Sequence, residues 1–96
     1  MLEIRQHCEN CGKFLPNNSD DAMICSYECT FCARCVDDVL HNVCPNCGGG
    51  FEKRPSRPEK HLVRHPASEQ KIVKPVDLNA FDALLQEKRH VDPRKR

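Results

Sequence analysis

Cysteines are the residues of this sequence whose type and spacing offer the most chemistry, and all eight lie in its first half. They form a C-x2-C pair, a C-x3-C-x2-C-x2-C run and a second C-x2-C pair: Cys8, Cys11; Cys25, Cys29, Cys32, Cys35; Cys44, Cys47. Two thiolates spaced by two residues can bind one metal ion, and zinc accepts four thiolates in a tetrahedron. The spacing therefore predicts two closed sites, each with a structural Zn²⁺ ion and no open position for a substrate.

The N-terminal segment bears on whether these cysteines bind metal or form disulfides. Residues 1–10, MLEIRQHCEN, have neither the apolar run nor the small-residue cleavage site of a secretory signal. No segment approaches the roughly 20 apolar residues of a membrane span. We therefore expect a cytoplasmic protein without membrane contact, whose thiols stay reduced and are available for two Zn²⁺ ions.

The small number of large apolar side chains in residues 1–51 leads to the same expectation. Burying one such side chain contributes about 1.5–3 kcal/mol, whereas ordering each residue costs about 1–2 kcal/mol of backbone entropy. In so short a module these terms roughly balance at best. We therefore expect metal binding to hold the fold together.

The elements that must position the cysteines are short. Two runs, 22–25 and 28–31, predict a β-hairpin. Residues 32–41 predict a helix, because apolar side chains recur on one face, with Thr30 as its N-cap.

A more specific pattern runs through the second half of the cysteine region. It consists of Cys29-Thr30-Phe31-Cys32-Ala33-Arg34-Cys35-Val36, then Leu40, then Cys44-Pro45-Asn46-Cys47. This pattern resembles the second half of a RING finger. The resemblance implies a treble-clef arrangement of cysteine turn, hairpin and helix, and a cross-brace of two zinc sites. The first site would be Cys8, Cys11, Cys32 and Cys35, and the second would be Cys25, Cys29, Cys44 and Cys47.

Spacing alone leaves another pairing open, in which consecutive cysteines share a site. The first four cysteines would then bind one ion and the last four the other. Two histidines, His7 and His41, also lie near ligands, and His41 precedes Cys44 by three residues. His41 is the better alternative ligand, although an exposed side chain is the simpler expectation for both.

Two further stretches, ICSYECTFC at 24–32 and VCPNCGG at 43–49, resemble a family of short bacterial proteins known as domain of unknown function 1272. The likeness covers roughly residues 1–58. It implies a bacterial protein of uncharacterised function and offers no activity.

The residues around the cysteines disfavour a ubiquitin ligase. RING ligases bind their E2 partner through an aliphatic residue inside the first pair, an apolar or tryptophan residue before the last pair, and often a basic residue after it. Here the first pair encloses Glu9 and Asn10, no tryptophan precedes Cys44, and Gly48 follows Cys47. Metalloprotease and phosphate-binding motifs are also missing, so we expect no catalytic residues and no enzyme.

The second half of the chain differs in composition and charge. Residues 1–50 carry three basic and seven acidic side chains, a net charge of −4, whereas residues 51–96 carry twelve and seven, a net charge of +5. Residues 52–76 contain four prolines and few large apolar side chains, which predicts a disordered basic linker. Residues 77–90 predict an amphipathic helix capped by Asp77, and residues 91–96 form a basic C-terminus.

The expected fold is therefore a small zinc-stabilised α+β module, residues 1–51, followed by a largely disordered basic tail that carries one short helix. We expect a monomeric, non-enzymatic protein-interaction module. The helix face that could contact an unknown protein partner, or dock on the module, is Leu78, Phe81, Leu84 and Leu85. The alternative function is a nucleic-acid-binding regulator that uses the basic tail, although the tail lacks interleaved aromatic side chains that stack on bases.

Overall fold

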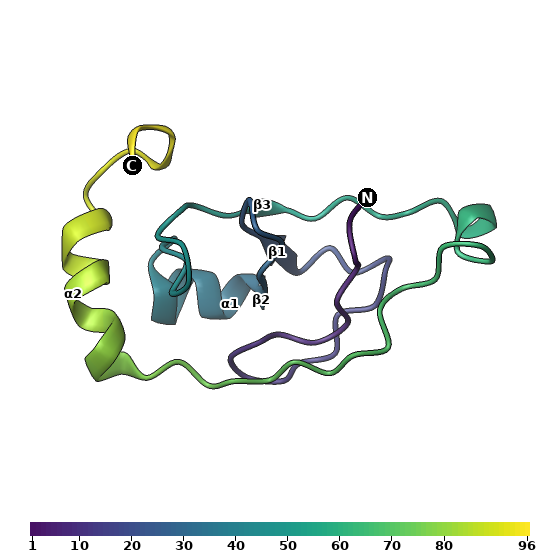
Figure 1. Cartoon of the computed structure of the whole chain (residues 1–96), viewed down its shortest axis with the longest axis horizontal. Coiled ribbons are helices and arrows are strands. Elements are labelled where there is room, and N and C mark those ends of the chain that lie inside the picture. The colour runs from purple at the N-terminus through teal and green to yellow at the C-terminus, as the bar shows by residue number, and fades with distance from the viewer.

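A three-stranded antiparallel sheet lies at the centre of the molecule in a computed structural model, which describes residues 1–96 (Figure 1). Its strands are β1 (Ala22–Ile24), β2 (Thr30–Cys32) and β3 (Glu52–Lys53), in the order β2-β1-β3. Met23 in the central strand pairs with Phe31 on one side and Lys53 on the other. The predicted hairpin is therefore present. The third strand, β3, was not predicted, because its two residues are polar and exposed and show no strand pattern.

The predicted helix at 32–41 is a short α-helix followed by a wider turn. α1 (Ala33–Cys35) continues into the π-helical turn Val36–Leu40, which ends at His41 with a left-handed φ of 48°. The helix follows directly on β2, so its N-cap is Cys32. The predicted cap, Thr30, is wrong because this residue lies in β2, where its hydroxyl donates to the Glu28 carbonyl at 3.0 Å.

The core of the module contains sulfur as well as hydrocarbon. Phe31 and Phe51 meet edge to face with ring centroids 5.5 Å apart. Leu15, Leu40 and Val43 are fully buried beside them. Six of the eight cysteines are buried in the same cluster: Cys8, Cys25, Cys29, Cys32, Cys35 and Cys44.

The prediction of a largely disordered tail is wrong. Residues 54–76, called here the belt, leave β3, turn at the 3-10 turn Glu59–His61 and return along the module to α2 (Leu78–Lys88) (Figure 1). Main-chain N–H groups of the belt donate to the module: Ser68 to the Glu3 carbonyl at 3.0 Å, and Lys74 to the Glu9 carbonyl at 2.7 Å. Polar backbone groups anchor this segment, so its few apolar side chains were a poor guide.

Arg54 anchors the start of the belt. Its side chain is buried, with the residue only 3% exposed. Its guanidinium donates to the Arg5 carbonyl at 2.6 Å, the Leu15 carbonyl at 3.0 Å and the Pro16 carbonyl at 2.7 Å. Burial lowers the pKa of this guanidinium, but an arginine remains charged at neutral pH. Three carbonyl oxygens thus compensate a buried positive charge.

The C-terminal helix α2 docks on the module. Asp77 caps it as predicted, because its carboxylate accepts from the Asn79 and Ala80 N–H groups at 3.0 and 3.2 Å. Phe81 is buried in the core, and Leu84 and Leu85 pack against that core. Of the four side chains expected to face a partner or the module, only Leu78 is largely exposed, at 60%.

The helices of this chain are short. None of them has both the length and the apolar character needed to cross a membrane.

Replacement of Arg54 tests whether the belt is anchored as described. Arg54→Ala leaves the Arg5 and Leu15 carbonyls without this donor, whereas the Pro16 carbonyl still accepts from the Ser19 N–H at 2.8 Å. Each unsatisfied buried acceptor costs about 1–3 kcal/mol. We expect the free energy of unfolding of the metal-loaded chain to fall by about 3 kcal/mol in urea denaturation. Arg64→Ala is the matched control, because Arg64 is exposed and forms no hydrogen bond. Equal stability of the two variants would contradict the anchoring role of Arg54.

Candidate metal centre

Four cysteine sulfurs, from Cys8, Cys11, Cys32 and Cys35, form the first cysteine group. All four lie within 4.8 Å of one another, and the Cys11 and Cys32 sulfurs are 3.8 Å apart. A tetrahedron with metal–sulfur bonds of about 2.3 Å has edges of about 3.8 Å, whereas sulfurs in a disulfide lie about 2.05 Å apart. The spacing therefore suits thiolates around a metal ion better than a disulfide.

A tight turn and the end of a strand bring this group together. Residues 8–12, the first cysteine turn, close through the Gly12 N–H, which donates to the Cys8 carbonyl at 2.9 Å. Gly12 has a φ of +79°, a conformation that glycine adopts without strain. The other two sulfurs come from Cys32, the last residue of β2, and Cys35, the last residue of α1.

The second cysteine group consists of Cys25, Cys44 and Cys47, whose sulfurs also lie within 4.8 Å of one another. Residues 44–50, the second cysteine turn, close through the Gly48 N–H, which donates to the Cys44 carbonyl at 2.8 Å. Backbone N–H groups approach the sulfurs, with Tyr27 donating to Cys25 and Gly49 donating to Cys47, each at 3.4 Å. At Cys25 the Tyr27 donor favours the charged, metal-binding form of the thiol.

Cys29 is the expected ligand that the structure leaves outside both groups. Its thiol is buried, and its sulfur accepts a hydrogen bond from the Asn46 amide at 3.3 Å. The first group has the same feature, because the Asn10 amide donates to the Cys35 sulfur at 3.4 Å. Cys29 and Cys35 thus accept the same kind of hydrogen bond from a cysteine turn, although only Cys35 belongs to a group.

The two asparagines are site residues that the sequence analysis missed. Each is the third residue of its cysteine turn, since residues 8–11 read C-E-N-C and residues 44–47 read C-P-N-C. The repetition of C-x-N-C was the available signal. In both turns the side chain reaches across to a sulfur contributed by the central cysteine run.

The grouping also bears on the alternative ligands. Cys8 and Cys11 lie with Cys32 and Cys35, which is the set that the RING resemblance implies, and not with the two cysteines that sequential pairing would give them. Neither histidine belongs to a group. His7 packs against the Phe14 ring, with centroids 5.7 Å apart, and His41 ends the π-helical turn.

Burial makes most of the shifted thiols reluctant to ionise without a metal. It raises the pKa of Cys25 to about 11 and also raises the pKa values of Cys32, Cys35 and Cys44. At Cys11 burial acts in the same direction, but hydrogen bonds from the Lys13 backbone and neighbouring cysteines outweigh it and lower the pKa. A cation between the sulfurs would remove the cost of charging these buried groups.

A family match that covers more than half of the chain accompanies these two cysteine groups and decides the family. The chain belongs to the family described as "Protein of unknown function (DUF1272)". The match covers residues 1–57 and so includes all eight cysteines of this DUF1272 protein.

An uncharacterised protein of Rhizobium meliloti (strain 1021) is 51% identical to this DUF1272 chain over 75 residues, which is 78% of this chain and 89% of the relative. That match is longer than residues 1–57 and therefore extends beyond the family match. No solved structure matches the chain.

The asparagine–sulfur hydrogen bonds can be tested one site at a time. Hydrogen bonds to metal ligands typically change metal affinity by about 10- to 100-fold. We expect Asn10→Ala to weaken metal binding at the first group and Asn46→Ala at the second, each by about tenfold. Cadmium NMR of the loaded chain gives one resonance per site, and competition with a chelator shows which is lost first. Asn18→Ala, an exposed asparagine, is the control, and equal behaviour of all three variants would contradict the assignment.

Proposed function

We propose that this protein is a non-enzymatic zinc protein in which two structural Zn²⁺ ions hold a RING-like, cross-braced module for protein interaction. The observation that carries the proposal is the first cysteine group, whose sulfurs have the spacing of a tetrahedral thiolate cage. The hairpin of β1 and β2 followed directly by α1 supports the treble-clef arrangement.

The first ion would be held by Cys8, Cys11, Cys32 and Cys35. The second would be held by Cys25, Cys44 and Cys47, with Cys29 as the fourth ligand. The Asn46 hydrogen bond supports this role for Cys29, because it repeats the bond from Asn10 to the ligand Cys35. Eight thiolates and no water position make both sites structural.

Contacts of the first cysteine turn support a function other than E2 recruitment. The residues that a RING ligase would present there are Glu9 and Asn10, and the belt covers both. Lys74 donates to the Glu9 carbonyl at 2.7 Å, and Val76 donates to the Asn10 amide oxygen at 2.9 Å. The Glu9 carboxylate itself is buried and accepts from the Thr30 N–H.

Exposed apolar side chains support the interaction role, since Phe14 and Tyr27 of the module lie in solvent together with Leu78 of α2. The nucleic-acid alternative has weaker support. Arg54 is buried against three carbonyls, and the Arg96 side chain donates to three main-chain carbonyls. Reduced thiols at both sites favour work in the cytoplasm.

Zinc stoichiometry tests this proposal directly. We expect native mass spectrometry of the full chain to show two zinc ions, with all eight cysteines reduced. Cys29→Ser should retain one ion firmly and lose the second, because only three thiolates remain at that site. Ser26→Ala, a change in the same hairpin turn, should retain two. One zinc or none on the unmodified chain, or disulfides, would overturn the proposal.

The pH dependence of zinc binding follows from the raised thiol pKa values. Thiols must lose their protons to bind zinc, and burial raises the pKa of Cys25 to about 11 and also raises that of Cys44. These groups are protonated at neutral pH without metal, so zinc affinity should rise with pH until it passes their pKa values. We expect the affinity to fall at least tenfold per unit between about pH 8 and about pH 6. Competition with a chelator measures this, and an affinity independent of pH would contradict it.

A further inference from the structure

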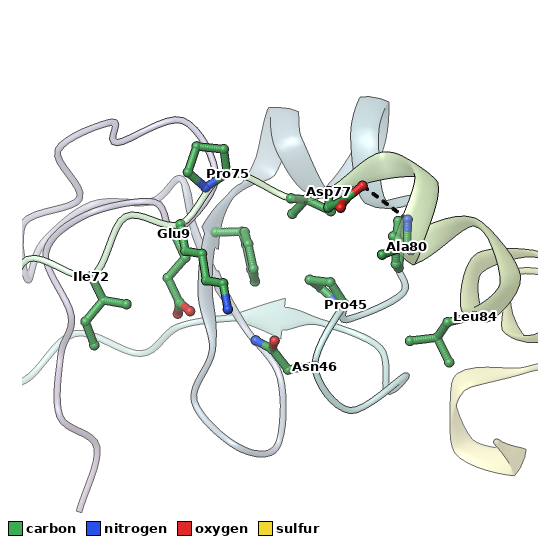
Figure 2. Close-up of a pocket in the computed structure, with 12 residues that line it drawn as sticks. Glu9, Pro45, Asn46, Ile72, Pro75, Asp77, Ala80 and Leu84 are labelled. Carbon is green, nitrogen blue, oxygen red and sulfur yellow. Dashed lines mark hydrogen bonds between the residues drawn. The ribbon is translucent and has the colours of Figure 1, made fainter.

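The second cysteine turn is in contact with much of the C-terminal segment, and the proposed function does not explain these contacts. A cavity of about 300 Å³ lies between this turn, the belt and α2, and Figure 2 shows Pro45 and Asn46 on one side of it with Ala80 and Leu84 on the other. Pro45 and Asn46 are the two residues between Cys44 and Cys47. The helix therefore lies against the turn that supplies two sulfurs of the second group.

The glycines after Cys47 bring the C-terminal segment against the backbone of this turn. A Cβ atom at Gly48 would lie 3.4 Å from Leu84 Cδ1 and 3.7 Å from Lys88 Cγ. A Cβ atom at Gly50 would lie only 2.7 Å from the Pro93 Cβ, a distance that real structures do not tolerate. Side chains of residues 84–93 thus occupy space that any larger residue in the turn would need.

Arg96 fastens the end of the chain to the same turn. Its guanidinium donates to the Asn42 carbonyl at 2.7 Å and to the Gly48 carbonyl at 3.1 Å. Arg94, two residues earlier, has a side chain 87% exposed, whose one ion pair, to Glu52 at 4.0 Å, is also on the surface. The two arginines are therefore close in sequence, but only Arg96 contacts the turn.

We propose that residues 78–96 form a clamp that retains the metal ion at the second cysteine group, and that loss of this ion releases the clamp. The inference rests on the proposed function, because it assumes that the second group binds an ion. It adds a regulated element to that site. No hydrogen bond joins residues 78–96 to residues 8–12 or 32–35, whereas Arg96 donates to the Gly48 carbonyl of the second turn. We therefore expect the effect at the second group.

Metal binding and clamp docking depend on the same conformation of residues 44–50. Bonds from Cys44 and Cys47 to an ion fix this turn, and the turn is the surface on which Leu84, Pro93 and Arg96 lie. An isolated helix as short as α2, with 11 residues, is marginal in water. When the turn loses its metal, the helix loses the surface that makes it stable.

Electrostatic attraction also favours docking of the clamp while the ion is bound. A Zn²⁺ ion with four thiolates carries a net charge of −2, and Lys88 and Arg96 lie at the turn that holds it. While the ion is bound, this negative cluster attracts the two basic side chains. By thermodynamic linkage, a clamp that depends on the metal must also raise metal affinity by the same factor.

Release of the clamp would uncover the apolar face of α2. Phe81 is buried and Leu84 and Leu85 pack on the core while the clamp is docked. Access of a protein partner to this face would then depend on the metal and thiol state of the second group. A chelator would act as the trigger.

Two matched pairs of variants test the clamp in the full-length, metal-loaded protein. Arg96→Ala and Phe81→Asp remove clamp contacts, whereas Arg94→Ala and Leu78→Asp make the same changes at exposed positions. Loss of metal to an excess of chelator is followed by cadmium NMR, with the two sites resolved. We expect the second site to lose its ion about tenfold faster in the first two variants, and the first site to be unchanged. The controls should match the unmodified chain.

Hydrogen exchange provides the reciprocal measurement. In Cys47→Ser, which disables the second site and leaves the first, amide protection of residues 78–88 should be lost while that of residues 22–32 persists. Two bound ions with unchanged release in both Arg96→Ala and Phe81→Asp would overturn the clamp and leave the zinc proposal intact. A chain that binds no metal would overturn both.

Discussion

The structure depends on buried cysteine sulfurs that must be held several ångströms apart from one another. Six cysteines lie in the same cluster as the aromatic pair Phe31 and Phe51. Sulfurs such as those of Cys11 and Cys32, 3.8 Å apart, are too distant for a disulfide, and raised pKa values make most of the shifted thiols costly to ionise. Metal bonds would satisfy both conditions. They would also supply the stability that a core with few apolar side chains lacks.

The hairpin makes the two cysteine groups depend on each other. Cys25 follows β1 and belongs to the second group, whereas Cys32 ends β2 and belongs to the first. Cys32 pairs with Ala22, so the register that places one ligand also places the other. Strands of three residues are too short to be stable alone, and β1 and β2 each end at or beside a cysteine of one group. Binding of the first ion should therefore order the second site in part.

Local patterns in the sequence predicted the hairpin, α2 with its Asp77 cap, and the cysteine set from which both groups are drawn. The sequence did not predict the features that depend on tertiary contacts. Nothing distinguishes Arg54, buried against three carbonyls, from Arg64, which is exposed, because carbonyl acceptors leave no trace in residue type. The same reason explains why the belt was mistaken for a disordered linker. Thr30 failed as a cap because pairing with Ile24 placed it in a strand.

The two asparagines show why the tail belongs to the metal-binding unit. Asn10 donates to Cys35 and accepts from the belt at Val76, so one side chain joins the first group to the tail. Asn46 donates to Cys29 and lines the cavity beneath α2. Residues 1–57 contain every sulfur, but neither of these contacts to the tail lies within that range. The ligands are thus a property of the family segment, whereas their environment is completed by the belt and α2. A chain cut at the family boundary would keep its cysteines and lose the groups that cover both cysteine turns.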